Sequence, residues 1–230
     1  MSIRVMGIVA LAGLAQVASG QTTYNDSTFD VFDNPPDRAY DHLDISSVTV
    51  SHDATNINFT INVRGNADSR DWAKFCVGID TGAAGGSSTN GWGRNIDWAG
   101  QGIDFWIGSW VDGGGGAELR AAPGWNLLAA TYNGDTTIGG SFNSPVTQRT
   151  LSVSRALLGL TGNDTFRFDV VTTGGGGGDP GVDHLSVAGL ATPGWGTASV
   201  AGTFLSYTIP TPGAASLLAL GGLLAARRRR

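Results

Sequence analysis

Residues 43–63 read LDISSVTVSHDATNINFTINV, and this stretch decides which fold the rest of the chain can join. Over 57–63 the apolar residues Ile, Phe, Ile and Val alternate with Asn and Thr. Because successive side chains point to opposite sides of a strand, this period of two predicts a β-strand with one apolar face. Residues 43–50 form a second candidate strand across the turn-like segment 51–55. The stretch therefore predicts a β-hairpin.

The same strand signal recurs along the chain. Further strands are predicted at 73–79, 103–111, 118–121, 125–132, 149–153, 166–170 and 203–209. The segments between them are rich in Gly, Ser, Asn and Asp, as is typical of turns and loops. No amphipathic helix longer than a turn or two is indicated. About eight short strands without a sequence repeat predict an all-β protein, a single antiparallel β-sandwich of the jelly-roll or immunoglobulin-like kind.

Composition supports the strand assignment. The good helix formers Glu and Lys are almost missing, since Glu118 is the only glutamate and Lys74 the only lysine. Cys76 is the only cysteine, so the chain has no intramolecular disulfide. It lies in the apolar segment 73–79, where we expect it to be a small buried hydrophobic residue.

Both ends of the chain carry targeting signals. A short basic start, an apolar run over 5–15 and the small residues of 18–20 predict a secretory signal peptide over 1–20, with cleavage before Gln21. At the other end, 213–226 is uncharged, and a helix over it would span about 21 Å, short of the roughly 30 Å bilayer core. Four arginines follow and would remain on the cytoplasmic side of the inner membrane.

The tail over 210–230 resembles the PEP-CTERM sorting signal of exported bacterial proteins. That signal consists of a short proline motif, an apolar helix and a terminal arginine cluster. The matching sorting residues here are Pro210, Thr211, Pro212, Arg227, Arg228, Arg229 and Arg230. Thr211 stands where the family has Glu. The resemblance implies an exosortase-type processing enzyme as a partner and a location at the cell envelope, at the cell surface or outside the cell. The alternative is a plain C-terminal anchor that is not processed.

Between these signals lie an irregular N-terminal arm, predicted over 21–42, and the β-sandwich domain, predicted over 43–209. The order of elements, such as KFCVGID and DFWIGSW after the opening hairpin, is similar to sandwich domains that include DOMON and family 9 carbohydrate-binding modules. The chain has 14 basic and 19 acidic residues, and Arg4 and the four terminal arginines belong to the signals. The remaining 9 basic and 19 acidic residues give a net charge of −10, which argues against a nucleic acid partner.

The strand over 103–111 carries the clearest candidate binding face. Trp106 and Trp110 alternate with apolar residues and should lie about 13 Å apart on one side. Exposed indole rings at that spacing could stack on sugar rings of a polysaccharide, and carboxylates could accept hydrogen bonds from hydroxyl groups. The candidate carbohydrate-binding residues are Trp106, Trp110, Asp104, Asp112, Trp92 and Trp98. The alternative is that these tryptophans pack against a second sheet or under a long loop.

Aspartates also suggest a cation site, although no EF-hand spacing occurs. Calcium favours several oxygen ligands from flexible acidic loops. The candidates are Asp26, Asp30, Asp33 and Asp37 in the arm and Asp179 and Asp183 after the glycine run 174–178. The alternative is a solvated acidic surface, so the metal remains an open question and no other cofactor is indicated.

No catalytic residues are predicted. Asp104 and Asp112 would stand roughly 26 Å apart along a strand, too far for the carboxyl pair of a glycosidase. The histidines at 42, 52 and 184 are scattered and lie in no catalytic motif, and most of them are expected at the surface or in turns. The sequence thus predicts a non-enzymatic surface or extracellular-matrix protein that binds polysaccharide. A purely structural matrix protein without a ligand and a glycan-acting enzyme with convergent aspartates remain alternatives.

Overall fold

The computed structural model describes residues 20–32, 40–141 and 147–210. The predicted signal peptide, apart from Gly20, and the predicted sorting tail, apart from Pro210, lie outside the described residues. Within the described ranges, no helix is both long enough and apolar enough to cross a membrane.

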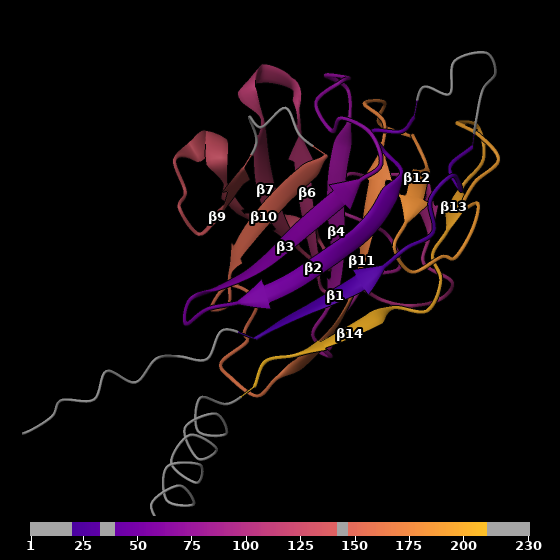
Figure 1. Cartoon of the computed structure of the whole chain (residues 1–230). Helices are drawn as coiled ribbons and strands as arrows, with labels where there is room; N and C mark the ends of the chain where they lie inside the picture. Colours follow the sequence, from indigo (N-terminus) through magenta and orange to yellow (C-terminus); the bar gives the residue numbers. More distant parts are fainter. Residues whose placement is uncertain (1–19, 33–39, 142–146, 211–230) are drawn as a thin grey trace, which may run out of the picture.

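Two antiparallel sheets pack face to face, which confirms the predicted all-β sandwich (Figure 1). The first sheet has the strand order β1-β2-β3-β10-β9. Its strands are β1 (Gln21–Asn25), β2 (Ile45–His52), β3 (Asn56–Val63), β9 (Ile138–Ser141) and β10 (Gln148–Ser154). Val50 of β2 pairs with Phe59 of β3 in antiparallel register, so the hairpin expected from the opening stretch is confirmed.

The second sheet has the order β12-β11-β4-β6-β7-β8, and β14 also pairs with β11. Its strands are β4 (Lys74–Asp80), β6 (Phe105–Trp110), β7 (Gly116–Ala121), β8 (Asn126–Ala130), β11 (Thr165–Thr173), β12 (Gly181–His184) and β14 (Leu205–Thr208). A short parallel pair, β5 (Ile96–Asp97) and β13 (Ser199–Val200), lies apart from both sheets. Among the described residues the only helices are the 3₁₀ turns η1 (Asp112–Gly114) and η2 (Thr131–Asn133).

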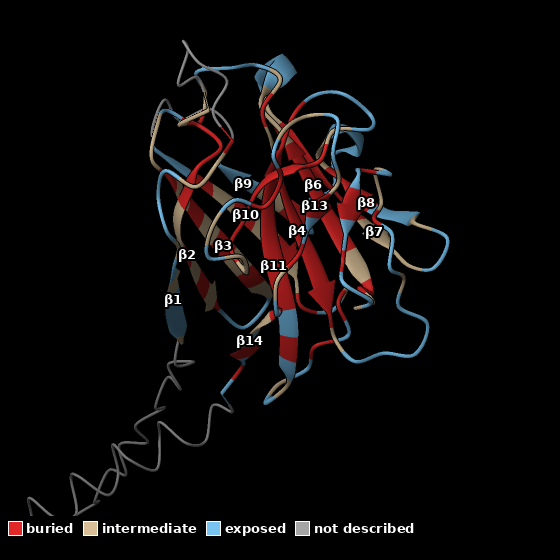
Figure 2. Ribbon diagram, turned by 90° about the vertical axis from the view of Figure 1, so that its right-hand side faces the viewer, coloured by how far each residue is buried: buried red, intermediate tan, exposed pale blue. Residues whose placement is uncertain are grey.

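The main core lies between the two sheets. Every second residue of β3 is buried, so the side chains of Ile57, Phe59 and Ile61 face inward and are fully shielded from solvent. Phe59 meets Phe168 of the opposite sheet with the ring centroids 5.6 Å apart. The buried residues concentrate in the central strands β4, β6 and β11 (Figure 2). The alternation in the sequence therefore predicted correctly which face of β3 packs.

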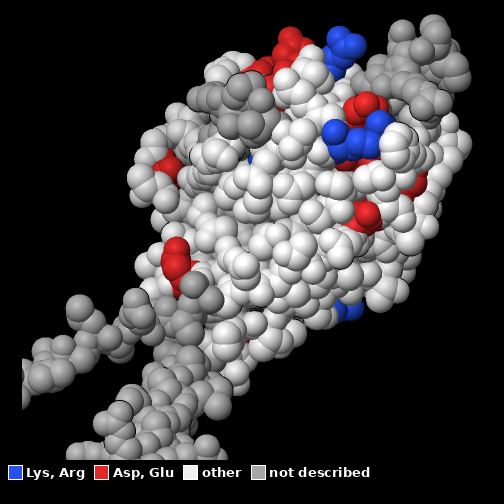
Figure 3. Space-filling model, viewed as in Figure 1, with Lys and Arg blue, Asp and Glu red and all other residues white. Residues whose placement is uncertain are grey.

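The outer face of the first sheet is polar but largely uncharged (Figure 3). Thr23, Thr49, Thr60 and Thr150 pair in register across four strands. The hydroxyl groups of Thr23 and Thr49 lie 2.8 Å apart, and those of Thr60 and Thr150 lie 3.3 Å apart. Cross-strand threonine pairs of this kind stabilise a sheet face that is open to water.

A second, smaller core covers the outer face of the second sheet. Segments 81–104 and 185–204 fold over β4, β6 and β11 and bury the outward side chains of those strands. The members of this core are Cys76, Ile96, Trp98, Ile103, Trp106, Val171, Ala201 and Phe204. The second sheet is therefore buried on both faces over much of its area, in contrast to the first.

Two expectations from the sequence are corrected. The first five residues of the expected irregular arm form β1, which pairs with β2 along its full length. His42, His52 and His184 are all at most 2% exposed, so none is a surface histidine. Burial of the last two is compensated by side-chain hydrogen bonds, from His52 to Tyr207 and from His184 to Asp169 and Ser199.

The two ends of the described chain lie together. The Tyr207 hydroxyl donates a 2.8 Å hydrogen bond to the carbonyl of Gly20, and Pro210 lies beside Gly20. Thr165, at this end of β11, pairs with Thr208, whereas Thr173 at the other end pairs with Lys74. Nine strand residues place Lys74 about 26 Å from the end where the chain enters and leaves the sandwich.

Cys76 is predicted to be inert while the protein is folded. Its side chain is fully buried, and burial raises the pKa of the thiol to about 12, so the reactive thiolate is not formed. An alkylating thiol reagent at mildly alkaline pH should leave the native protein unmodified and should modify one site per chain in denaturant. Rapid modification of the native protein would contradict the placement of β4 in the interior.

Candidate functional site

An open hollow of about 300 Å³ lies at the outer side of the second sheet. It is lined by Lys74, Trp92, Arg94, Trp110 and Asp112. The Trp92 and Trp110 ring centroids are 6.4 Å apart, and Tyr132, which is 60% exposed, continues the row 6.0 Å from Trp110. The rings are mutually tilted by about 40°. Three partly exposed aromatic rings in a row form a surface on which flat apolar groups can stack.

Two strand glycines make room for these tryptophans. A Cβ atom on Gly108 of β6 would lie 2.2 Å from Trp92 Cζ2, and a Cβ atom on Gly116 of β7 would lie 2.4 Å from Trp110 Cζ2. Each six-membered indole ring therefore rests directly against the backbone of the sheet. Glycine inside a strand often marks a close approach of this kind.

Glu118, a buried residue of β7, holds two rings of this aromatic row, Trp92 and Tyr132, in position. Its carboxylate accepts hydrogen bonds from Trp92 Nε1 (2.6 Å) and the Tyr132 hydroxyl (3.1 Å), and it forms an ion pair with Arg120 at 2.5 Å. Burial alone would raise the pKa of Glu118, but the hydrogen bonds from Arg120 and Trp92 outweigh it, so the pKa is lowered. Glu118 is therefore a charged positioning group.

The loop before β5 carries Trp92 and Arg94 and is held by one side chain. The buried Asn90 accepts hydrogen bonds from the backbone N–H groups of Trp92 and Arg94 and donates one to the Arg94 carbonyl. Gly93, between them, has a φ of +63°, a conformation that favours glycine. The sequence NGWGR thus builds a tight turn that directs both side chains into the hollow.

The hollow contains more positive than negative charge. Lys74 pairs with Asp112 at 2.6 Å, and the Asp112 side chain is 57% exposed. The Arg94 guanidinium lies 5.3 Å from the centre of the Trp92 ring, and its Nε and Nη1 atoms are buried without a hydrogen-bond partner among the described residues. Two cations line the hollow beside one exposed carboxylate, and the two unpaired nitrogens of Arg94 lie beneath its surface.

A second hollow of about 390 Å³ adjoins the first. It is lined by Asp71, Trp72, Lys74, Asp112 and Gly175 and therefore shares the Lys74–Asp112 ion pair. The two hollows form a continuous strip with tryptophans on both sides of the ion pair. A strip of this shape suits an extended ligand better than a compact one.

Three of the residues predicted to bind carbohydrate are not on this surface. Trp106 and Trp98 are 0% and 1% exposed, because the covering segments bury them against β6, and neither presents a ring to solvent. Asp104 is also buried, and it accepts hydrogen bonds from Thr81 and Ala83 that anchor the following loop. These three are corrected from surface to interior residues. The structure brings together Trp92, Trp110 and Asp112.

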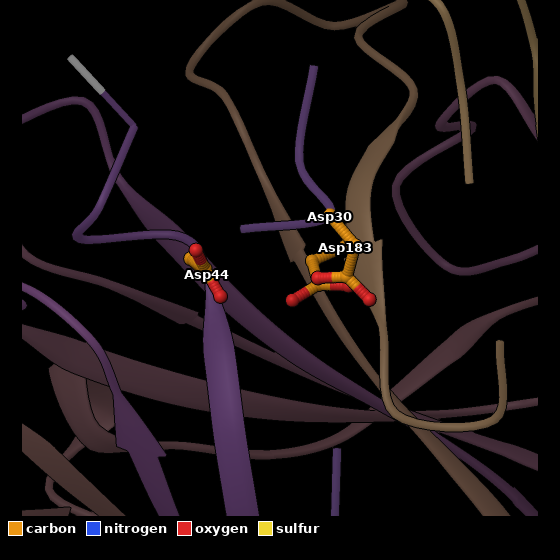
Figure 4. Close-up of side chains that lie close together, drawn as sticks. All are labelled: Asp30, Asp44 and Asp183. Carbon is orange, nitrogen blue, oxygen red and sulfur yellow. The ribbon is translucent and has the colours of Figure 1, made fainter. Parts of the chain in front are cut away.

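Three aspartates from distant parts of the chain converge elsewhere (Figure 4). Asp30 lies in the arm, Asp44 directly precedes β2, and Asp183 belongs to β12. One oxygen from each lies within 4.8 Å of the others. Of the cation candidates from the sequence, Asp30 and Asp183 meet here, Asp179 instead caps the glycine run through the Gly176 N–H, and Asp33 and Asp37 lie outside the described residues.

Burial of this acidic cluster affects its ionisation. Desolvation raises the pKa of Asp183 well above its usual value, with a contribution from the charge of Asp26. Desolvation, with smaller contributions from neighbouring carboxylates including Asp30 and Asp44, raises the pKa of Asp26 to about 7, although the hydrogen bond from the Ser27 N–H lowers it. Burial therefore favours the protonated form of Asp183 and of Asp26.

One buried network of hydrogen-bonded side chains was not expected from the sequence. His184 contacts Asp169 through Nδ1 at 2.7 Å and Ser199 through Nε2 at 2.9 Å. The three residue types match a serine hydrolase triad, but all three side chains are completely buried and Ser199 Oγ already accepts the Gly181 N–H. These hydrogen bonds connect β11, β12 and β13, and the buried Ser199 hydroxyl is not accessible to a substrate as a nucleophile.

Comparison with known proteins gave no assignment. No family model matches the chain, and no curated protein matches it either.

Proposed function

We propose that this protein is an exported, non-enzymatic cell-surface or extracellular-matrix protein that binds polysaccharide. The observation that carries the proposal is the open hollow in which Trp92 and Trp110 are partly exposed beside the cationic side chains Lys74 and Arg94. Aromatic rings bind the apolar faces of sugars, and charged donors bind their oxygen atoms.

The charges of the hollow favour an acidic polysaccharide. Lys74 and Arg94 are cationic and Asp112 opposes them, while the adjoining hollow adds the exposed carboxylate of Asp71. A carboxylate on the sugar would be attracted by the two cationic side chains that line the hollow, Lys74 and Arg94. The adjoining hollow extends the strip past Lys74 toward Trp72, as binding to several residues of a polymer requires.

Placement of the hollow supports a role at the cell envelope. Gly20 and Pro210, where the targeting signals predicted from the sequence join the domain, lie side by side. Lys74 lies about one strand length of β11 away from them. A domain attached through its tail, before processing by an exosortase-type enzyme, would present the hollow away from the membrane.

The two alternatives differ from this proposal in observable ways. A purely structural matrix protein would bind no glycan although its aromatic row is partly exposed. A glycan-acting enzyme needs two carboxyl groups in a cleft, at about 5–9.5 Å. The acidic cluster brings carboxylates within 4.8 Å, but Asp44 and Asp183 are fully buried and line neither hollow.

Affinity electrophoresis of the purified protein tests the proposal. We expect retardation by alginate and polygalacturonate and much weaker retardation by neutral dextran. Added salt should weaken the binding, because it screens the attraction between the cationic side chains of the hollow and the sugar carboxylates. Equal mobility in all gels would contradict carbohydrate binding, and equal retardation by dextran would contradict the preference for acidic sugars.

A further inference from the structure

The acidic cluster has the properties of an ion site. We infer that Asp30, Asp44 and Asp183 bind one calcium ion and thereby hold the N-terminal arm against both sheets. This inference is independent of the proposed polysaccharide binding, because it uses different residues.

The separation of the oxygens fits a single ion. Calcium binds oxygen ligands at about 2.3–2.6 Å, so two ligands on opposite sides of the ion lie about 5 Å apart. One oxygen from each of the three aspartates lies within 4.8 Å of the other two. In Figure 4 the three carboxylates face a common space, with an oxygen of Asp44 directed toward the other two.

Asp44 supplies the observation that points to a ligand. Its side chain is fully buried, and Oδ2 accepts hydrogen bonds from Phe29 N–H (2.9 Å) and Arg64 Nε (2.7 Å). Its other oxygen, Oδ1, is buried and has no hydrogen-bond partner in the part of the chain that the structure describes. A buried carboxylate oxygen without a partner is costly, and a bound cation removes that cost.

The other two ligands retain capacity for an ion. Asp183 accepts the N–H of Ile45 at Oδ2 and that of His184 at Oδ1, which leaves a second lone pair on each oxygen. Asp30 is only partly buried and reaches the cluster from the arm. Because a carboxylate offers two oxygens, three aspartates can supply more than three of the six to eight ligands that calcium takes.

The excess of carboxylates at this site also favours a cation. Asp26 lies near enough to interact electrostatically with Asp30, Asp44 and Asp183. Within residues 20–32, 40–141 and 147–210, one cation forms direct ion pairs with these four carboxylates, Arg64, which also binds Asp41. All the donors are hard oxygen atoms, which favours Ca²⁺ or Mg²⁺ over thiophilic metals. Three directly ligating carboxylates favour Ca²⁺, since Mg²⁺ usually keeps several waters.

An ion here would connect three segments that are far apart in sequence. Asp30 belongs to the arm, Asp44 precedes β2 of the first sheet, and Asp183 belongs to the edge strand β12 of the second. Binding to the native state alone stabilises that state by mass action. Calcium is thus expected to act as a clamp at the edge of the sandwich.

Equilibrium dialysis and thermal unfolding test this inference on the whole protein after treatment with EDTA. We expect one Ca²⁺ per chain and, at about a hundred times the dissociation constant, a Tm higher by about 5–10 °C. Binding of no Ca²⁺, or a Tm unchanged by it, overturns the inference. A Mg²⁺ effect equal to or larger than that of Ca²⁺ overturns the assignment to calcium.

Two matched variants identify the site. Asp30→Asn keeps the shape of a partly buried side chain and is expected to remove the Tm increase and at least 10-fold of the affinity for Ca²⁺. Asp135→Asn changes an exposed aspartate between β8 and β9, which are the edge strands opposite β12 and β1 in the two sheets, and should bind Ca²⁺ like the original protein. Equal binding by Asp30→Asn and Asp135→Asn would overturn the assignment of the ion to this cluster.

Discussion

Replacing Trp92 and Trp110 together with alanine is expected to reduce affinity for acidic polysaccharide by roughly 30-fold or more. Well-packed tryptophan anchors contribute about 2 kcal/mol each, which corresponds to about 30-fold. Because the two rings lie 6.4 Å apart, their contributions to the binding free energy are coupled and do not simply add. The effect expected for one tryptophan is therefore taken as the minimum for the double variant. Quantitative affinity electrophoresis in alginate measures this effect.

Trp125→Ala is the matched control. Trp125 is a partly buried tryptophan of the turn between β7 and β8 and lines neither hollow. Its indole Nε1 donates to the Thr89 hydroxyl at 2.9 Å, so the substitution also removes one ring and one hydrogen bond. Unchanged alginate binding is expected. A loss equal to that of the double variant would show that removal of any tryptophan weakens binding and would contradict the assignment of the hollow.

Gly108→Ala is expected to destabilise the protein and to displace Trp92 from the sheet. The added methyl group would lie 2.2 Å from Trp92 Cζ2, and the indole cannot move without breaking its hydrogen bond to Glu118. Overpacking of this kind typically costs about 1–3 kcal/mol. For a domain of this size each kcal/mol lowers Tm by about 2–4 °C, which thermal unfolding measures directly.

Gly139→Ala controls for the change of a strand glycine. Gly139 lies in β9, at the edge of the first sheet, and a Cβ atom there meets nothing within 4 Å. This variant should unfold within about 1 °C of the original protein, since surface substitutions usually change stability by less than about 0.5 kcal/mol. A similar Tm for the Gly108 and Gly139 variants would mean that Trp92 does not rest on β6.

Local patterns predicted the fold well because strand faces are encoded by neighbouring residues. The alternation over 57–63 correctly placed Phe59 in the core, and the alternation around Ile107 correctly put Trp106 on the opposite face of β6. What the sequence could not show was that segments 81–104 and 185–204 fold over that face. Burial of Trp106 depends on this long-range packing, whereas Trp110, near the end of the strand, stays partly exposed.

The candidate sites were only partly predictable for the same reason. Asp30 and Asp183 were recognised as cation candidates, but they are more than 150 positions apart, and only the sandwich brings them to Asp44. Asp44 was not singled out, because it lies inside the hairpin stretch. Glu118 stands out in the sequence as the only glutamate, and this was the one signal that could have pointed to the aromatic site. Its contacts with Trp92 and Tyr132 depend on the loop before β5 and on the turn η2 after β8, which local patterns do not place.

The most direct measurement is an NMR titration of the indole N–H signals of the seven tryptophans in ¹⁵N-labelled protein, with short alginate oligosaccharides. The signals of Trp92 and Trp110 should shift in a saturable way, while those of the buried Trp98 and Trp106 should stay in place. If no indole signal moves, or if only those of the two buried tryptophans move, the hollow does not bind acidic sugars as we propose.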